Sequence, residues 1–452
     1  MRTSPLKSIV LIALFTIASA QAADKLVVGY YPDWNRTLLP PSAIPYQSLT
    51  HILHAFLLPA ADGTVPGMSG FAYADLVQTA HLHNVKVLVS LGGWGGSGGF
   101  SSMCADTAAR RRFVAAMTSF CASSGYDGVD IDWEYPADAT DRNNFRILVS
   151  ELRQSLNSLT PHRFISIAAP STGWSGQWFD VAGMLNDLDW IGMMTYDFYG
   201  SWTAKAGPNA ALYGSFSTNS EGWVDYSATY YLGRGVSQEK LLIGIPLYGW
   251  VFNASSLYGT STGATQASYA SIIPRLQQGW TRYWDDVGSV PYMINGAGTQ
   301  LISYDDSLSV ATKCAYVVNK GLGGAIIWAL GQDKLGNRQP IMEVIGAGLR
   351  PTTSVDTHNG AGAGPASLAL LQNYPNPFNG QTRIRYRMPE AGDVRLTLCD
   401  VLGHELHVLV HNTQPAGDYE IVLSSDALPS GVYFIRLAWR SFVATRVCVV
   451  LR

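Results

Sequence analysis

The residues best suited to chemistry are four acids in an eight-residue stretch, D-G-V-D-I-D-W-E, that otherwise has the character of a buried strand: Asp127, Asp130, Asp132 and Glu134. Successive side chains of a strand point to opposite faces, so Asp130, Asp132 and Glu134 share one face. Asp127 lies on the other face, and we expect only a supporting hydrogen-bonding role for it. Neighbouring carboxylates in a poorly solvated site cannot all ionise, so at least one should stay protonated near neutral pH. A protonated acid above an ionised partner could donate its proton to a glycosidic oxygen.

Such a cluster of acids could also form a buried hydrogen-bonded network or bind a divalent cation. A cation site would favour Asp, Asn and Gly in a loop, whereas these acids alternate along a strand. The G-x-G-x-x-G pattern at 93–98 also follows a strand-like run, but no ribose-binding acid follows it at the required distance. We therefore expect neither a metal nor a cofactor.

The elements that would position the acids are indicated by short apolar runs with amphipathic stretches of helical period between most of them. The eight runs are 26–31, 51–56, 85–93, 128–133, 164–169, 190–196, 241–248 and 323–330. This alternation predicts a (β/α)8 TIM barrel, with a doubly wound open sheet as the alternative. In a barrel, Glu134 would emerge at the carboxyl end of the fourth strand, where the active sites of this fold lie. The gap before the eighth run is the longest, which predicts a small insertion between strands seven and eight.

Composition divides the chain into segments. Residues 1–22 have a basic start, an apolar stretch shorter than a membrane span and a small-residue end, which predicts a secretory signal peptide. Residues 25–349 form the predicted catalytic barrel, and residues 350–366 have the composition of a linker. Residues 367–452 alternate with period two between turn signals, which predicts a small all-β sandwich of immunoglobulin-like type.

The overall composition excludes some partners and favours others. The net charge is −3 with no basic stripe, so nucleic-acid binding has no support. Thirteen Trp and 23 Tyr with only 14% charged residues suggest a neutral ring-shaped partner such as a sugar. No segment after the signal peptide predicts a transmembrane helix. The five cysteines are expected to be buried thiols, although Cys104–Cys121 and Cys399–Cys448 are conceivable disulfides.

Four motifs resemble, in order, those of glycoside hydrolase family 18, the chitinase family. They are S-L-G-G-W-G-G at 90–96, D-G-V-D-I-D-W-E-Y-P at 127–136, M-M-T-Y-D-F-Y-G at 193–200 and G-G-A-I-I-W-A-L at 323–330. The resemblance covers residues 25–349. It implies a secreted chitinase that cleaves β-1,4-linked N-acetylglucosamine in chitin and chito-oligosaccharides. It also implies a retaining mechanism in which the acetamido group of the substrate is the nucleophile, through an oxazolinium ion.

The resemblance assigns roles to individual residues. Glu134 would be the acid and then the base, Asp132 would orient the acetamido group, and Asp130 would share a proton with Asp132. Tyr196 would hydrogen-bond the acetamido carbonyl. Together with aromatic residues that could serve as sugar platforms, the expected substrate contacts are Trp328, Asp197, Met194, Tyr31, Phe56, Trp94 and Trp250. The expected supporting residues are Asp127, Ser90, Gly92 and Gly93.

Two departures from the family pattern concern the subsites. Trp250 follows Tyr248 and Gly249 where chitinases often have an Arg, so a sugar-contacting Arg is missing or replaced by aromatic stacking. After the last strand, Gly331 and Gln332 replace an acidic continuation.

Two alternative functions share these residues. An endo-β-N-acetylglucosaminidase acting on N-glycans or peptidoglycan-derived glycans would use the same chemistry, although Trp133 and Tyr135 beside Glu134 are more similar to the chitinases. A non-catalytic chitin-binding lectin on an inactive barrel typically lacks the acid at the position of Glu134, which is intact here.

Residues 370–452 resemble the C-terminal sorting domain of type IX secretion cargo. The match lies in N-Y-P-N-P-F-N at 373–379 and S-G-V-Y-F-I-R-L at 430–437. It implies recognition by the type IX secretion machinery and a protein that is secreted or attached to the bacterial cell surface. The alternative, a carbohydrate-binding module, would need a row of exposed aromatic residues, and most aromatic residues here alternate into the expected core.

Overall fold

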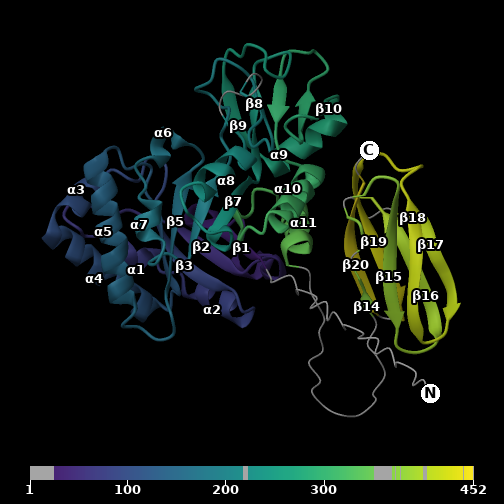
Figure 1. Ribbon diagram of the computed structural model, residues 1–452, viewed down its shortest axis with the longest axis horizontal. Coiled ribbons are helices and arrows are strands. Elements are labelled where there is room, and N and C mark those ends of the chain that lie inside the picture. The colour runs from purple at the N-terminus through teal and green to yellow at the C-terminus, as the bar shows by residue number, and fades with distance from the viewer. Residues whose placement is uncertain are drawn as a thin grey trace, which may run out of the picture.

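The computed structural model describes residues 25–216, 222–350, 369–371, 373–376, 378–400, 405–440 and 442–450. It contains a closed parallel barrel with helices around it, an inserted antiparallel sheet and two further antiparallel sheets at the carboxyl-terminal end (Figure 1). The predicted signal peptide, residues 1–22, lies outside the described residues. The predicted linker, residues 350–366, does so too, apart from its first residue.

The barrel is closed by eight parallel strands in the cyclic order β1-β13-β7-β6-β5-β4-β3-β2. Closure comes from the pairing of the first strand with the last, in which Leu26 lies opposite Gly324. This confirms the predicted (β/α)8 barrel and excludes the open sheet. The strands are β1 (Leu26–Pro32), β2 (His51–Leu57), β3 (Lys86–Gly92), β4 (Gly128–Asp132), β5 (Phe164–Pro170), β6 (Trp190–Met194), β7 (Leu241–Pro246) and β13 (Gly324–Trp328).

The surrounding helices form where apolar residues recur with helical period. In α4 (Thr107–Ser124) this period buries Phe113, Met117 and Phe120. Asp106 caps the first turn of α4 by accepting from the Ala109 N–H, and Gly125 ends the helix with a φ of +74°. The other α-helices are α1 (Met68–Phe71), α2 (Ala74–Leu82), α3 (Phe100–Ala105), α5 (Ala139–Leu156), α6 (Gly173–Gly176), α7 (Val181–Met184), α8 (Val224–Leu232), α9 (Tyr269–Ile272), α10 (Ser307–Asn319) and α11 (Pro340–Leu349).

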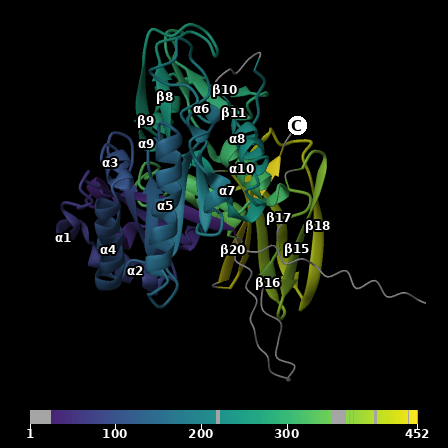
Figure 2. The same cartoon turned by 60° about the vertical axis from the view of Figure 1, so that its left-hand side comes forward.

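The predicted insertion between the seventh and eighth barrel strands is a five-stranded antiparallel sheet in the order β10-β11-β12-β8-β9. We call this sheet and its connections the inserted lobe. Both views show it standing at one end of the barrel (Figures 1 and 2). Its strands are β8 (Tyr248–Phe252), β9 (Ala264–Ser268), β10 (Thr281–Asp285), β11 (Val290–Ile294) and β12 (Leu301–Ser303).

The carboxyl-terminal residues form two antiparallel sheets, as predicted, which we call the sandwich. One sheet has the order β14-β15-β18 and the other β17-β16-β19-β20. In β15, residues alternate strictly between exposed and buried, because one face of its sheet covers the core of the sandwich. The strands are β14 (Ala369–Leu370), β15 (Gln381–Met388), β16 (Gly392–Cys399), β17 (Glu405–Gln414), β18 (Gly417–Ser424), β19 (Gly431–Trp439) and β20 (Phe442–Val450).

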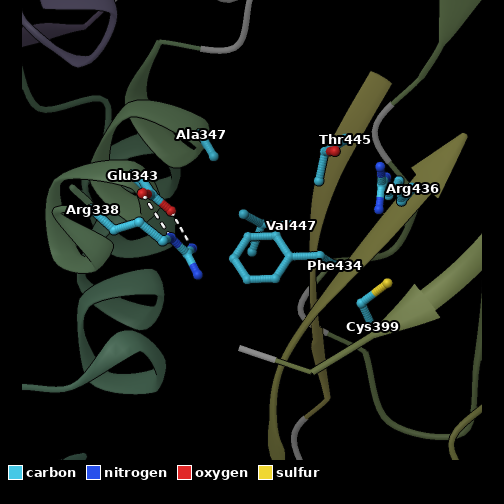
Figure 3. Close-up of a pocket in the computed structure, with 8 residues that line it drawn as sticks. All are labelled: Arg338, Glu343, Ala347, Cys399, Phe434, Arg436, Thr445 and Val447. Carbon is cyan, nitrogen blue, oxygen red and sulfur yellow. Dashed lines mark hydrogen bonds and ion pairs between the residues drawn. The ribbon is translucent and has the colours of Figure 1, made fainter. Parts of the chain in front are cut away.

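The sandwich contacts the side of the barrel through β19 and β20, which lie against α10 and α11. Val432, Val447 and Val449 join the apolar cluster that surrounds the barrel strands. A cavity of about 420 Å³ lies at this junction. Figure 3 shows Phe434 and Val447 pointing from the sandwich toward α11, opposite the paired side chains of Arg338 and Glu343.

The five cysteines are all buried and unbridged, so the two conceivable disulfides are wrong and the prediction of buried thiols is confirmed. Burial raises the pKa of the Cys121 and Cys314 thiols to about 12. Within the described part of the chain, no helix is long and apolar enough to cross a membrane.

Candidate active site

Asp130 and Asp132 point to the axis of the barrel from the buried strand β4. Asp130 is only 1% exposed. Its Oδ1 accepts a hydrogen bond from Ser166 Oγ at 2.6 Å, and its Oδ2 accepts from Ser90 Oγ at 2.7 Å and from the Tyr30 hydroxyl at 3.2 Å. Burial raises the pKa of Asp130 above its ordinary value, and the three hydroxyl donors oppose this rise.

Asp132 is 4% exposed, and its carboxylate has fewer hydrogen-bond partners than that of Asp130. Its Oδ1 has no hydrogen-bond partner among the residues that the structure describes. Burial raises its pKa well above the ordinary value, and the negative charges of Glu134 and Asp130 raise it further. The side chain is therefore a buried acid with a free acceptor oxygen at the axis of the barrel.

Glu134 follows β4 at the carboxyl end of the barrel and is half-buried. Burial is the main cause that raises its pKa from 4.5 to about 7. A hydrogen bond with Tyr135 opposes the shift, and the nearby charge of Asp197 adds to it. Glu134 can therefore hold a proton near neutral pH and can release it without a large penalty, as a general acid and base must.

The backbone of Glu134 is held by Ser97, a residue that sequence reasoning missed. Ser97 Oγ accepts from the Glu134 N–H at 2.9 Å and lies 3.2 Å from the carbonyl oxygens of both Gly93 and Asp132. Gly92 allows this close approach, since its φ is +101° and an added Cβ would lie 2.3 Å from the Asp132 carbonyl oxygen. The glycine-rich loop after β3 thus supports the segment after β4 that carries Glu134.

Strand β6 brings Met194, Tyr196 and Asp197 to the same end of the barrel. Met194 packs against the apolar cluster at the axis. Burial raises the pKa of Tyr196 well above its ordinary value, and the charges of Asp132, Glu134 and Asp197 raise it further. The Tyr196 hydroxyl therefore stays protonated and able to donate.

Trp250, expected as a sugar platform, is only 6% exposed, and its contact with a sugar stays a prediction. Its Nε1–H donates to Asp197 Oδ1 at 2.8 Å, and the Tyr248 hydroxyl donates to the same oxygen at 2.7 Å. Asp197 thus has two neutral donors. Burial raises its pKa, and the two hydrogen bonds oppose the rise.

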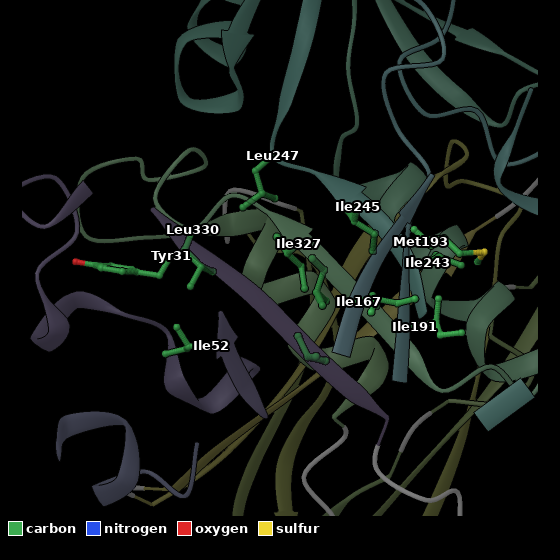
Figure 4. Close-up of a cluster of buried hydrophobic side chains, with 14 of the residues drawn as sticks. Tyr31, Ile52, Ile167, Ile191, Met193, Ile243, Ile245, Leu247, Ile327 and Leu330 are labelled. Atoms are coloured by element: carbon green, nitrogen blue, oxygen red, sulfur yellow. The ribbon is translucent and has the colours of Figure 1, made fainter. Parts of the chain in front are cut away.

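An aromatic cluster lies beside the acids. The rings of Phe56 and Trp328 are stacked with centroids 5.7 Å apart, and Tyr30 meets Trp328 at 5.4 Å. Tyr31, which we expected to contact the substrate, is fully buried and donates its hydroxyl to the Leu39 carbonyl at 2.8 Å. Figure 4 shows it among the buried hydrophobic side chains of the cluster that surrounds the barrel strands. The Tyr31 side chain therefore lies on the outer face of β1, whereas Tyr30 faces the axis and the Asp130 carboxylate.

Other aromatic side chains are exposed. Trp94, on the glycine-rich loop, is 83% exposed as expected, and its contact with a sugar stays a prediction. Trp34, Trp174 and Trp202 are exposed as well. A cavity of about 500 Å³ lies beside Phe56 and is lined on its polar side by Asp33.

Asp127 lies at the start of β4, away from the carboxyl end. Its Oδ2 accepts from the Val87 N–H at 2.8 Å and lies 2.6 Å from His81 Nε2, and Lys86 Nζ is 3.4 Å from its Oδ1. Its hydrogen bonds thus lie at the amino end of the strand, away from the other acids, and a supporting role in the site stays a prediction.

Two models of known families match the chain. The model described as glycosyl hydrolases family 18 matches residues 26–333, which include the three acids and the aromatic cluster. The model described as a secretion system C-terminal sorting domain matches residues 372–450.

Individual relatives and structures are similar to the same region. A probable endochitinase of Caenorhabditis elegans is 34% identical over 346 residues, which cover 67% of this chain and 55% of the relative. Chitinase 1 of Aphanocladium album is 29% identical over 386 residues, with coverage of 77% and 88%. The crystal structure of a group IV chitinase of Ostrinia furnacalis has a TM-score of 0.67 at 26% identity and covers 72% of this chain and 100% of that chain.

Proposed function

The chain belongs to family 18 of the glycosyl hydrolases, and from this premise we propose that it is a chitinase. Its substrates are chitin and chito-oligosaccharides, and it cleaves their β-1,4 linkages between N-acetylglucosamine residues with retention of configuration. The observation that carries this proposal is Glu134, a half-buried carboxyl at the carboxyl end of the barrel whose pKa is raised to about 7.

The reaction would begin with proton transfer from Glu134 to the glycosidic oxygen. As the bond from that oxygen to C1 breaks, the acetamido carbonyl oxygen of the same sugar forms a bond to C1 and gives an oxazolinium ion. Glu134, now a carboxylate, takes a proton from a water molecule whose oxygen attacks C1 and opens the ring. The product keeps the β configuration, and Glu134 is protonated again.

The neighbouring residues would orient the acetamido group. The unpartnered Asp132 Oδ1 is a suitable acceptor for the acetamido N–H, and a negative Asp132 would stabilise the positive charge of the oxazolinium ion. The Tyr196 hydroxyl would donate to the acetamido carbonyl oxygen. Trp328 would be the floor on which the sugar stacks, since its ring is only half-buried.

The second family match bears on where the enzyme works. Residues 372–450 match a secretion system C-terminal sorting domain. We propose that the type IX secretion machinery recognises these residues and that the chitinase acts outside the cell or on its surface.

The test is hydrolysis of chito-oligosaccharides by the full chain, with Glu134→Gln as the control for contaminating activity. We expect wild-type turnover and, by NMR, initial products in the β configuration. Initial α products would contradict the retaining mechanism. Cleavage of N-glycans or peptidoglycan fragments without cleavage of chito-oligosaccharides would replace chitin as the substrate, and binding without any cleavage would overturn the enzymatic proposal.

A further inference from the structure

Asp197 is held in an uncommon backbone conformation. Its φ is +57°, in the left-handed region that residues other than Gly seldom adopt. Its backbone N–H donates to Asn209 Oδ1 at 3.0 Å. Because the backbone conformation sets the direction of the side chain, whatever stabilises this φ also sets where the Asp197 carboxylate points.

Asn209 is fully buried and connects three segments. Its Nδ2 donates to the carbonyl oxygen of Tyr248 on β8 at 3.1 Å, and its backbone N–H donates to Ser303 Oγ on β12 at 2.7 Å. Its own carbonyl accepts from the Phe198 N–H at 3.1 Å. One residue therefore links the loop after β6 to two strands of the inserted lobe.

The same amide acts on both ends of one interaction. Its oxygen holds the backbone of Asp197, and its nitrogen holds the backbone of Tyr248, whose hydroxyl donates to Asp197 Oδ1 at 2.7 Å. Removing the Asn209 amide would therefore release both the donor, Tyr248, and the acceptor, Asp197. It would also leave the Tyr248 carbonyl and the Asp197 N–H without these partners.

We propose that Asn209 is a positioning residue through which the inserted lobe fixes the Asp197 carboxylate beside Glu134. The inference rests on the proposed chitinase activity. Asn209 acts through Asp197 and does not itself reach the reacting atoms.

A positioning role predicts a change in pH dependence that a purely structural role does not. The Asp197 charge raises the pKa of Glu134, so a displaced carboxylate should lower the pH at which Glu134 loses its proton. The other titratable groups that interact with Glu134 or Asp197 are Asp132, Tyr135, Tyr196 and Tyr248. Of these, Tyr248 is the one that the Asn209 amide holds, so its hydroxyl is displaced together with the Asp197 carboxylate.

The experiment compares wild type, Asn209→Ala, Asn209→Asp and Asn373→Ala in the full chain. Asn209→Asp keeps an acceptor for the Asp197 N–H but loses the donor to Tyr248. Asn373 is the matched control, a buried Asn of the sandwich whose Nδ2 donates to Thr382 Oγ1 at 2.9 Å. We expect Asn209→Ala to lower kcat on chito-oligosaccharides by about 10- to 100-fold with little change in KM. The basic limb of its pH profile should move to lower pH, Asn209→Asp should have a smaller effect, and Asn373→Ala should keep the wild-type kcat and profile.

A second measurement does not depend on turnover. The indole N–H of Trp250 donates to Asp197, so its NMR resonance reports the position of the carboxylate; Trp250→Phe assigns the signal. We expect this resonance to shift in Asn209→Ala and not in Asn373→Ala. An unshifted resonance in folded Asn209→Ala would overturn the proposal, as would a wild-type kcat and pH profile. A wild-type chain without turnover would instead overturn the proposed function, and the resonance would still decide the role of Asn209.

Discussion

Strand β4 of the barrel and strand β15 of the sandwich both alternate charged with apolar side chains, but their charged groups are in opposite environments. On β15, the side chains of Arg383, Arg385 and Arg387 are exposed and lie opposite residues of β18 that include two acids. Glu420 accepts from Arg383 and Arg385, and these hydrogen bonds lower its pKa. On β4, the acids point into the barrel and their pKa values rise.

The difference lies in burial and in the available cations. In the described part of the chain, no Lys or Arg forms an ion pair with Asp130, Asp132 or Glu134, whereas Asp127, just before the same strand, contacts Lys86. An exposed acid beside Arg stays ionised and contributes little beyond solubility. Burial without a cation raises the pKa of an acid, so that Glu134 can hold a proton near neutral pH. The same period-two pattern thus builds a charged surface in one domain and a row of acids with raised pKa values in the other.

The largest expected effect is a loss of activity when a buried acid of the barrel, but not an exposed acid of the sandwich, is replaced. Replacing Glu134 by Gln removes the proton donor, so we expect kcat/KM on chito-oligosaccharides to fall by about 10²- to 10⁴-fold. Replacing Glu420 by Gln should leave kcat/KM unchanged. Equal losses in the two variants, measured by initial rates, would break the comparison.

The next effect is on stability and depends on pH. Folding raises the pKa of Glu134 from 4.5 to about 7, so the fold favours the protonated carboxyl. This contribution to the free energy of unfolding is fully present below pH 4.5 and is lost as pH rises to about 7. Above that pH the free energy of unfolding is lower by on the order of 3 kcal/mol. Glu134→Gln should therefore stabilise the barrel against urea at pH 8 and have almost no effect at pH 4. If Glu134→Gln increased the free energy of unfolding at pH 4 as much as at pH 8, the pKa of Glu134 would not be raised by folding.

A smaller effect is expected for Ser97→Ala, which leaves the Glu134 N–H without its acceptor. We expect about a tenfold lower kcat, and partial recovery in Ser97→Thr, which restores the hydroxyl. Ser424→Ala is the matched control at the end of β18, where Ser424 Oγ donates to Asp426 at 2.7 Å. A kcat in Ser97→Ala equal to that of Ser424→Ala would show that the hydroxyl does not position Glu134.

The smallest effect concerns the exposed ion pairs of the sandwich. Glu420→Gln should leave the melting temperature almost unchanged, and any difference should shrink further as salt is added. Calorimetry of the full chain at low and high salt measures this. A shift comparable to that of Glu134→Gln at pH 8 would mean that exposure does not separate the two groups of acids.

The sequence was sufficient for the acids and the barrel because both depend on local periodicity. Parity along β4 placed Asp130 and Asp132 on the axis face, and alternating runs predicted the strands that close the barrel. In β1 the sequence does not show which residues face the axis, because Tyr30 and Tyr31 are both aromatic and both buried. Tyr30 faces the axis and Tyr31 faces the helices. Only the closure of the barrel distinguishes them.

The positioning residues could not be predicted for a different reason. Asn209 and Ser303 are 94 residues apart and meet only because the inserted lobe folds back onto the loop after β6. Trp250 was identified as aromatic and near the site, but its burial and its hydrogen bond to Asp197 depend on the same packing. No local pattern signals a contact that tertiary structure creates.

The closure of the barrel between its first and last strands also sets an order of events during synthesis. Tyr30 and Trp328, whose rings meet at 5.4 Å, are among the first and last parts of the barrel to leave the ribosome. Such long-range contacts form late, because the intervening chain must be ordered first. Residues 372–450, which match the sorting domain, are translated later still. A chain that presents them for export therefore already contains every strand of the barrel, and a chain that stops short of them lacks the means of being sorted.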